Sequence, residues 1–206
     1  MGLAAAVVDG QTIRYLKAFG FADREQNVAA DPRRTVWRLA SLSKGVTGVI
    51  ATRLAQRRIV DLDAPLPNLE PAFVSPTRFL PPNCNEHACS RRLPEGATAI
   101  SLNLLLHHRS GIVHYSNGVG SPSPPQEMAD DVNHNTGIRW ALNYLSGQPL
   151  VIQPGARFDY TSFGYNLLGA SLESLTGQSF DELLRNEVAR PADAVSLQVE
   201  RLWEPI

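Results

Sequence analysis

The sequence has 206 residues, 43% of them hydrophobic, so it is long enough to enclose a core of its own. Its 19 basic and 20 acidic residues leave a formal net charge of −1, which predicts no electrostatic attraction to nucleic acid or to an anionic membrane. No apolar run reaches the length of about 18 residues that a membrane span needs, and no basic stretch precedes the first apolar residues as in a secretory signal, so the compartment stays open.

Two short runs of apolar and β-branched residues open the chain, at residues 3–8 and 12–19. The Asp9-Gly10 pair between them is typical of tight hairpin turns, which need positive φ angles. We therefore expect an antiparallel hairpin, followed by a polar loop to Arg34. Unpaired hairpin edges are templates for association, so self-association through them is a further expectation.

Residues 36–58 combine an apolar helical pattern with a serine and a lysine. The pattern has the i, i+3, i+4, i+8 spacing of a helix that faces a core, here running from Leu42 to two arginines at its end. The apolar positions are Val46, Val49, Ile50 and Leu54. Gly45 and Gly48 each cost such a helix about 1 kcal/mol relative to alanine, which suggests that another backbone approaches closely there.

Ser41 and Lys44 stand one turn apart at the start of this helix. Residues three apart share a helix face, so the Lys44 amine can reach the Ser41 hydroxyl, and a helix N-terminus favours developing negative charge. This arrangement is typical of an activated serine nucleophile. The alternative is that Ser41 caps a buried helix while Lys44 extends into solvent.

Two segments with little periodicity, residues 67–98 and 117–135, are predicted to be surface excursions. Cys84 and Cys89 lie in the first, where a disulfide is one possibility. With His87 they could supply part of a zinc site, but no fourth ligand is evident, so we expect no metal.

Ser101 is suited to cap a short helix over residues 102–108 that Gly111 closes. Three histidines accompany this helix and invite a metal or general-base hypothesis. They are His107, His108 and His114. The first two are adjacent and so point about 100° apart on a helix, and no carboxylate stands at ligand spacing. We therefore expect a helix-end role for these histidines.

The rest of the chain predicts three helices, joined by a turn at residues 153–156. The first covers residues 136–145 around Trp140 and Tyr144, and the second ends at Gly177. The leucines that mark the second are Leu167, Leu168, Leu172 and Leu175. Ser179 and Glu182 form a capping box for the third helix, which Pro191 ends. One strand is expected after residue 194.

Three stretches, ASLSKGVTGV, LLLHHRSGIVHY and PGARFDYTSFGYNLLG, resemble in order and spacing the serine β-lactamase and penicillin-binding-protein-like family. The resemblance is greatest to its class C branch, with the related esterases, DD-peptidases and mitochondrial serine β-lactamase-like peptidases. It covers nearly the whole chain and implies one domain over residues 1–206 with the α/β (α+β) β-lactamase/transpeptidase-like fold. It implies neither a metal nor an organic cofactor.

Carried over residue by residue, the resemblance makes Ser41 the acylating nucleophile, Lys44 the partner that holds its proton, and Tyr160 the phenol that moves a proton beside it. Tyr160 must then lie against the Lys44 ammonium, which would lower the phenol pKa from about 10. The alternative is a buried tyrosine with a satisfied hydroxyl. Ser162 stands at the substrate-binding position where the family usually has Asn; it lacks the amide donor, so penicillin-type substrates are less favoured.

The family's third motif, a Lys-Thr-Gly or His-x-Gly triplet on a sheet strand, does not occur before Ile206. In the family that strand supplies a second backbone N–H to the oxyanion hole, and losing one such donor costs about 10² to 10³ in rate. The expected fold is therefore incomplete and truncated at both ends: the N-terminal hairpin of the sheet and the helical lobe, without the C-terminal strands.

These features predict a serine hydrolase that attacks an amide or ester of a small molecule or peptide through an acyl-enzyme on Ser41. The alternative is a catalytically inactive fragment, or a binding module whose sheet a partner completes.

Overall fold

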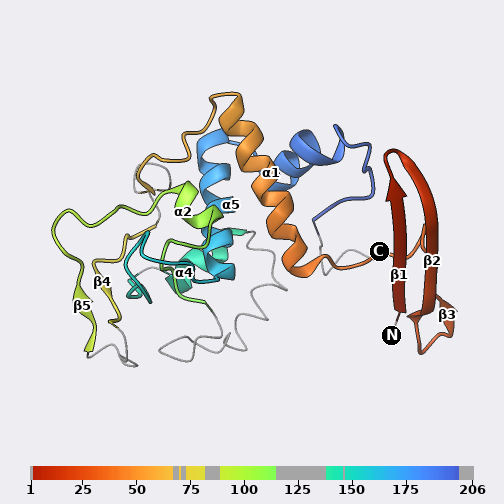
Figure 1. Cartoon of the computed structure of the whole chain (residues 1–206), viewed down its shortest axis with the longest axis horizontal. Helices are drawn as coiled ribbons and strands as arrows, with labels where there is room; N and C mark the ends of the chain where they lie inside the picture. The colour runs from red at the N-terminus through yellow and green to blue at the C-terminus, as the bar shows by residue number, and fades with distance from the viewer. Residues whose placement is uncertain are drawn as a thin grey trace. The chain divides into compact units, whose positions relative to one another are not determined.

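The first 39 residues form a small antiparallel sheet, and a compact helical unit begins at Ala40. The computed structural model describes residues 2–66, 70, 73–81, 89–114, 138–145 and 147–199 (Figure 1). The mixed α/β architecture expected from the sequence is confirmed.

In the N-terminal unit, strand β1 (Gly2–Asp9) pairs with β2 (Thr12–Asp23), and β2 pairs with the short β3 (Val28–Ala29). The hairpin prediction is confirmed, with Gly10 at φ 59° in the turn. The stretch to Arg34 is not all loop as expected, because β3 adds a third strand there.

Helix α1 (Ser43–Gln56) follows a 3-10 turn, η1 (Ala40–Leu42). Its buried stripe is Thr47, Ile50, Ala51 and Leu54. Expecting Val49 on this stripe was wrong, since Val49 is 46% exposed. Thr47 can join the core because its hydroxyl donates to the Ser43 carbonyl, which satisfies the polar group without water. The explanation offered for the two glycines is also wrong: among the described atoms, a Cβ at Gly45 would meet nothing within 4 Å, and one at Gly48 only a leucine side-chain carbon.

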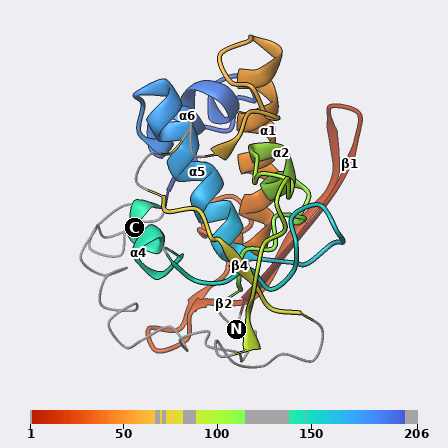
Figure 2. The same ribbon diagram turned by 90° about the vertical axis from the view of Figure 1, so that its left-hand side faces the viewer.

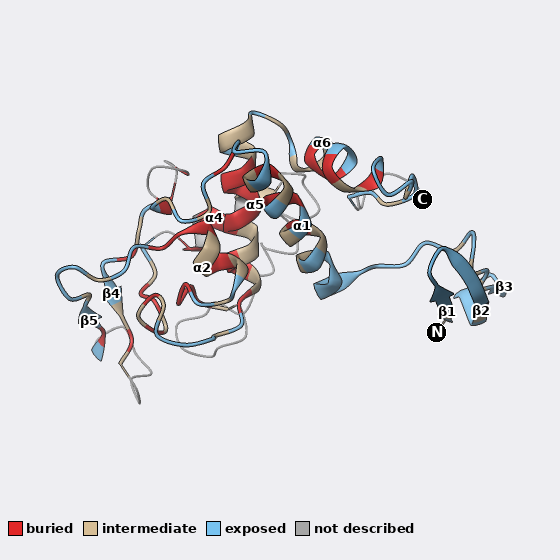
Figure 3. Ribbon diagram, turned by 45° about the horizontal axis from the view of Figure 1, so that its top comes forward, coloured by how far each residue is buried: buried red, intermediate tan, exposed pale blue. Residues whose placement is uncertain are grey.

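The central helix of the second unit is α5 (Ser162–Thr176), which ends before Gly177 as its sequence predicts. The Thr161 side chain accepts from the Gly164 N–H at one end, and Gly177 takes the left-handed conformation (φ 68°) at the other. In Figure 2, α1 and α2 lie on one side of α5 and α4 (Ala141–Leu145) on the other. Figure 3 shows buried residues gathered where these helices meet α5.

Helix α2 (Leu102–Leu106) has the predicted Ser101 cap, but it ends before both histidines. His108 leaves the helix in the left-handed region at φ 53°, so the chain turns away before Gly111. Gly111 therefore does not close α2 as expected; a glycine is needed there because the backbone of Ile152 approaches closely. It has φ 76°, and a Cβ there would lie 2.3 Å from the Ile152 carbonyl oxygen.

The predicted capping box opens α6 (Phe180–Leu184), which continues as a π-helical turn (Arg185–Ala189). In that turn the buried Glu187 accepts from both Arg53 and Arg57 of α1, which joins the two helical segments. The strand expected after residue 194 is wrong for residues 195–199, which form no strand. Residues 200–206 lie outside the described part.

The segment 67–98 is only partly a surface excursion. Its strands β4 (Arg78–Phe79) and β5 (Arg91–Arg92) form a short antiparallel ladder, but five described residues of the segment are buried. They are Glu70, Phe73, Pro76, Leu80 and Ser90. The segment packs inward because Glu70 accepts from Arg139 at 2.7 Å and from Ser174 of α5 at 2.6 Å.

Several other expectations fall outside the described residues: the excursion at residues 117–135, Cys84, His87, residues 136–137 and the side chains of Trp140 and Tyr144. The described end of that helix is a 3-10 turn, η4 (Ile138–Trp140), leading into α4. Cys89 is disulfide-bonded. Of the helices in the described ranges, none has the length and apolar character that crossing a membrane requires.

Candidate active site

Ser41, Lys44 and Tyr160 meet in the second unit, although 119 residues separate the serine from the tyrosine. Ser41 Oγ lies 2.8 Å from Tyr160 Oη, and Lys44 Nζ donates to the same Oγ at 3.3 Å. Since an ammonium only donates, the Ser41 hydroxyl accepts from Lys44 and can direct its own proton to the phenol oxygen. This is the connected hydroxyl, amine and phenol that the sequence predicts.

The serine is presented by a strained turn at the N-terminal end of α1. Ala40, just before it, has φ 45°, a left-handed conformation that alanine adopts at a cost of about 1 kcal/mol. Ser41 does not cap the helix: Leu42 occupies the cap position, and no side chain caps the helix there. The capping alternative is therefore wrong, and the hydroxyl is left exposed at the positive end of a 14-residue helix.

Lys44 lies against two aromatic rings. Its Nζ is 5.0 Å from the ring centre of Tyr160 and 5.8 Å from that of Tyr165. Such contacts stabilise the ammonium, because the face of an aromatic ring carries partial negative charge. The Tyr165 hydroxyl donates to the Leu106 carbonyl at 2.9 Å, which fixes this second ring.

The Tyr160 phenol has a pKa below its ordinary value of 10.0. Hydrogen bonding from the Lys44 ammonium is the main cause, followed by the bond to Ser41, because both stabilise the phenolate form. Tyr160 is 37% exposed, so it is not the buried tyrosine of the alternative reading. Its oxygen is accessible and easier to deprotonate than an ordinary phenol.

Ser162 begins α5 next to this phenol. Hydrogen bonding from its side chain also lowers the pKa of Tyr160, although less than Lys44 does. The expected substrate-binding residue therefore lies beside the three reactive side chains.

Two histidines at the site were given the wrong role by sequence reasoning. His108 and His114 were expected to serve a helix end, but the ring centres of both lie near that of Tyr160, at 4.5 Å and 5.5 Å. Only His107 has the expected role, with its Nδ1 2.8 Å from the Asn103 carbonyl at the end of α2. The signal that could have found the other two is their position just before the Tyr160 motif in a stretch that leaves its helix early.

Residues 1–201 of the sequence match the family model described as Beta-lactamase. The chain belongs to the beta-lactamase family. The family resemblance predicted from the three sequence stretches is thereby confirmed.

Two curated proteins illustrate the range of relatives. The chain is 31% identical over 215 residues to "Esterase EstB" of Burkholderia gladioli, covering all of this chain and 50% of that protein. It is 23% identical to the mouse "Serine beta-lactamase-like protein LACTB, mitochondrial", covering 84% of this chain and 39% of the relative. The chain thus spans half or less of these relatives' lengths.

The fold likeness extends to solved structures. The penicillin-binding protein from Bacillus halodurans superposes with a TM-score of 0.67 at 22% identity, over 93% of this chain and 51% of that structure. At this identity the likeness concerns the fold, and it supports the β-lactamase/transpeptidase-like architecture.

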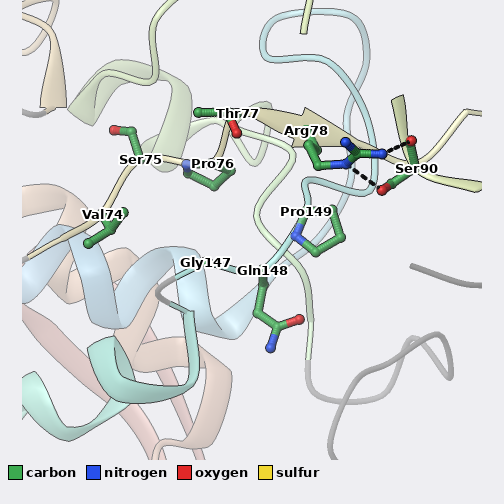
Figure 4. A pocket seen from close by; sticks show the side chains of 9 residues that line it. All are labelled: Val74, Ser75, Pro76, Thr77, Arg78, Ser90, Gly147, Gln148 and Pro149. Carbon is green, nitrogen blue, oxygen red and sulfur yellow. Dashed lines mark hydrogen bonds between the residues drawn. The ribbon is translucent and has the colours of Figure 1, made fainter. Parts of the chain in front are cut away.

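The structure also has a hollow of about 340 Å³ that is separate from the Ser41, Lys44 and Tyr160 site (Figure 4). It is lined by residues 74–78, Ser90 and residues 147–149, and includes none of the three reactive side chains. Arg78 occupies one wall, where its Nε donates to Ser90 Oγ at 2.8 Å. No group of three or more potential metal ligands occurs among the described residues.

Proposed function

We propose that this chain carries the nucleophilic half of a serine hydrolase that cleaves an ester or amide through an acyl-enzyme on Ser41. The observation that supports this most strongly is the 2.8 Å separation of Ser41 Oγ and Tyr160 Oη, with the Lys44 ammonium on the same hydroxyl. The family assignment and the esterase name of one relative support the same reaction class.

In the proposed reaction, Tyr160 takes the Ser41 proton as Oγ attacks the substrate carbonyl carbon. A tetrahedral oxyanion forms, and its collapse breaks the bond to the leaving group, which receives the proton from Tyr160. Water then attacks the acyl carbonyl carbon while Tyr160 takes its proton. The second tetrahedral intermediate collapses by breaking the bond to Ser41 Oγ, which receives the proton from Tyr160, so the free acid leaves and the Ser41 hydroxyl is restored. Lys44 keeps the phenolate form accessible throughout, because its positive charge stabilises the phenolate.

The N-terminal end of α1 would favour the oxyanion, since its backbone N–H groups and dipole carry partial positive charge. The substrate proposed is an ester or amide of a small molecule or peptide. Leu42, 72% exposed beside the nucleophile, and Phe158, 63% exposed against the His108 ring, favour an apolar group next to the reacting carbonyl. No cofactor takes part in these steps.

A direct test is the hydrolysis of p-nitrophenyl butyrate by the wild-type chain and by Ser41→Ala. We expect wild-type turnover above the buffer rate and its loss in Ser41→Ala, because the Ser41 hydroxyl is the one bonded to both Tyr160 and Lys44. Ser43→Ala is the matched control, since Ser43 is also an exposed serine, two residues further along the chain, and the variant should retain the wild-type rate. Equal rates for wild type and Ser41→Ala would reject the proposal.

A second candidate function is a non-catalytic module whose sheet is completed by another polypeptide. It is favoured by the N-terminal unit, in which large apolar side chains on paired strands remain exposed. Leu3 and its cross-strand partner Phe19 are 61% and 50% exposed, and Val7 opposite Tyr15 is 55% exposed. An exposed apolar sheet face favours association, and β1 also lies at the edge of the described three-stranded sheet.

Size-exclusion chromatography with light scattering, combined with amide hydrogen exchange, distinguishes the two candidates. A module that needs completion should associate with concentration, and β1 amides should gain protection as it does. A monomer at all concentrations with fully protected β1 amides would contradict the second candidate.

A further inference from the structure

The backbone that carries Tyr160 is held by one short stretch, residues 108–114, through four hydrogen bonds. Two involve only ordinary groups: the Asp159 N–H donates to the His108 carbonyl at 2.7 Å, and the buried Thr161 hydroxyl donates to the Val113 carbonyl at 2.9 Å. The other two end on imidazole rings. The N–H groups that donate these two bonds belong to Thr161 and Ser162, the two residues that follow Tyr160.

His108 Nδ1 accepts from the Thr161 N–H at 3.1 Å, and His114 Nδ1 accepts from the Ser162 N–H at 3.2 Å. A backbone N–H can only donate, so each Nδ1 must present a lone pair and each ring, while neutral, must carry its proton on Nε2. The rings also confine the tyrosine. His108 lies against it with an interplanar angle of 32°, and His114 stands edge-on at 89°.

We infer that His108 and His114 are positioning residues: as neutral imidazoles they hold the Thr161 and Ser162 backbone and thereby keep the Tyr160 phenol against Ser41. A proton added to Nδ1 of either ring removes the lone pair and opposes one N–H with another, so the hydrogen bond is lost. The site therefore requires both rings to be uncharged. The positioning of Tyr160 by the two histidines does not depend on the proposed function. Only the expected effect on the hydrolysis rate rests on that function.

The surroundings favour the neutral rings. Burial is the first cause that lowers the pKa of both imidazoles below 6.5, and the Lys44 ammonium on α1 is the second. His114 lowers the pKa of His108 further, whereas the Asp159 carboxylate opposes the shift at His114. Among the described residues, the phenol of Tyr160 also lies against both rings and that of Tyr165 against His108.

Long-range ¹H–¹⁵N NMR of the histidine-labelled chain tests the geometry without any activity. At pH 7 we expect His108 and His114 as Nε2–H tautomers that titrate below pH 6.5. His107 is an internal reference of opposite kind, because its Nδ1 faces a carbonyl oxygen and must therefore carry a proton. An Nδ1–H tautomer or an imidazolium at His108 or His114 at pH 7 would overturn the inference.

The consequence for the site is tested with the double variant His108→Asn/His114→Asn, in which an amide oxygen can accept the N–H but cannot titrate. Asparagine also tolerates the φ of 53° at position 108. Relative to its rate at pH 7.5, this variant should keep at pH 5 at least about threefold more activity on p-nitrophenyl butyrate than His107→Asn, the matched control. An equal loss of activity from pH 7.5 to pH 5 in the double variant and in His107→Asn would contradict the inference.

A readout independent of turnover is the Tyr160 phenol titration, followed by its ring carbon shifts in NMR. Replacing both histidines by alanine should move the Tyr160 pKa toward 10, because the phenol leaves Lys44, whereas His107→Ala should leave it unchanged. If the histidine tautomers and the Tyr160 titration are as expected but the wild-type chain shows no hydrolysis, the proposed function fails and the positioning role stands. If the Tyr160 titration is unmoved in a folded double alanine variant, the positioning role fails.

Discussion

Replacing Tyr160 by phenylalanine removes one oxygen and keeps the ring that contacts Lys44 and His108. The Ser41 hydroxyl then loses its 2.8 Å partner. Its bond to Lys44 at 3.3 Å remains, but it points the wrong way for proton acceptance because the ammonium donates. A positioned acid or base contributes about 10² to 10⁴ in rate, or about 2.7 to 5.4 kcal/mol of transition-state stabilisation.

We therefore expect Tyr160→Phe to lower kcat/KM for p-nitrophenyl butyrate by about 10² to 10⁴, mostly through kcat, because the phenol acts in the chemical step. The assay is initial-rate spectrophotometry at pH 7.5, with the burst of p-nitrophenol as a measure of acylation. Far-ultraviolet circular dichroism establishes that the variant is folded.

Tyr165→Phe is the matched control for this substitution. It also removes a phenol oxygen beside Lys44, but that oxygen is bonded to the Leu106 carbonyl and not to Ser41. Its cost should be about 1 kcal/mol in unfolding free energy, with little change in rate. A loss in Tyr160→Phe of less than about threefold, or equal losses in both variants, would refute a proton-transfer role for Tyr160.

Three further predictions concern stability. Ala40→Gly should raise the unfolding free energy by about 1 kcal/mol, or about 2 to 4 °C in thermal midpoint, because glycine removes the strain at φ 45°; an unchanged midpoint would argue against strain there. Gly111→Ala should lower it by about 2 to 3 kcal/mol in urea titrations, because its Cβ would lie 2.3 Å from the Ile152 carbonyl oxygen, and a neutral substitution would contradict this packing. Because the folded-state pKa values of His108 and His114 lie below 6.5, the unfolded chain binds more protons beneath that pH. The stability they contribute should be complete above about pH 6.5 and lost as pH falls through the folded-state values. Urea titrations should therefore show a larger fall in unfolding free energy from pH 7.5 to 5 for the wild type than for the double asparagine variant, and equal falls would contradict this.

Elements with local chemical signals could be predicted from the sequence. The Asp9-Gly10 turn, the helix end at Gly177 and the Ser179 capping box each depend on residues within a few positions of one another. Ser41 and Lys44 are one helical turn apart, so their contact is local as well. Tyr160 is different, because nothing in the spacing of the chain links it to Ser41 across 119 residues; only the family resemblance suggested the contact.

The histidines show where pattern reasoning fails in physical terms. Their directions were judged on a continuous helix, but the chain leaves α2 after Leu106 and His108 takes a left-handed conformation. A single residue with positive φ redirects everything after it, and histidine does not signal such a turn as glycine does. The prediction that Val49 is buried was wrong because the pattern counts only apolar residues. The Thr47 hydroxyl donates to a carbonyl of its own helix, so Thr47 is buried while Val49 is exposed.

The central claim is that Ser41 is a nucleophile activated by Lys44 and Tyr160, and covalent labelling with a fluorophosphonate followed by peptide mass mapping tests it most directly. The account predicts one adduct per chain on Ser41, unchanged in Ser43→Ala and strongly slowed in Tyr160→Phe. A folded wild-type chain that carries no adduct on Ser41, or the same labelling in Ser41→Ala, would contradict it.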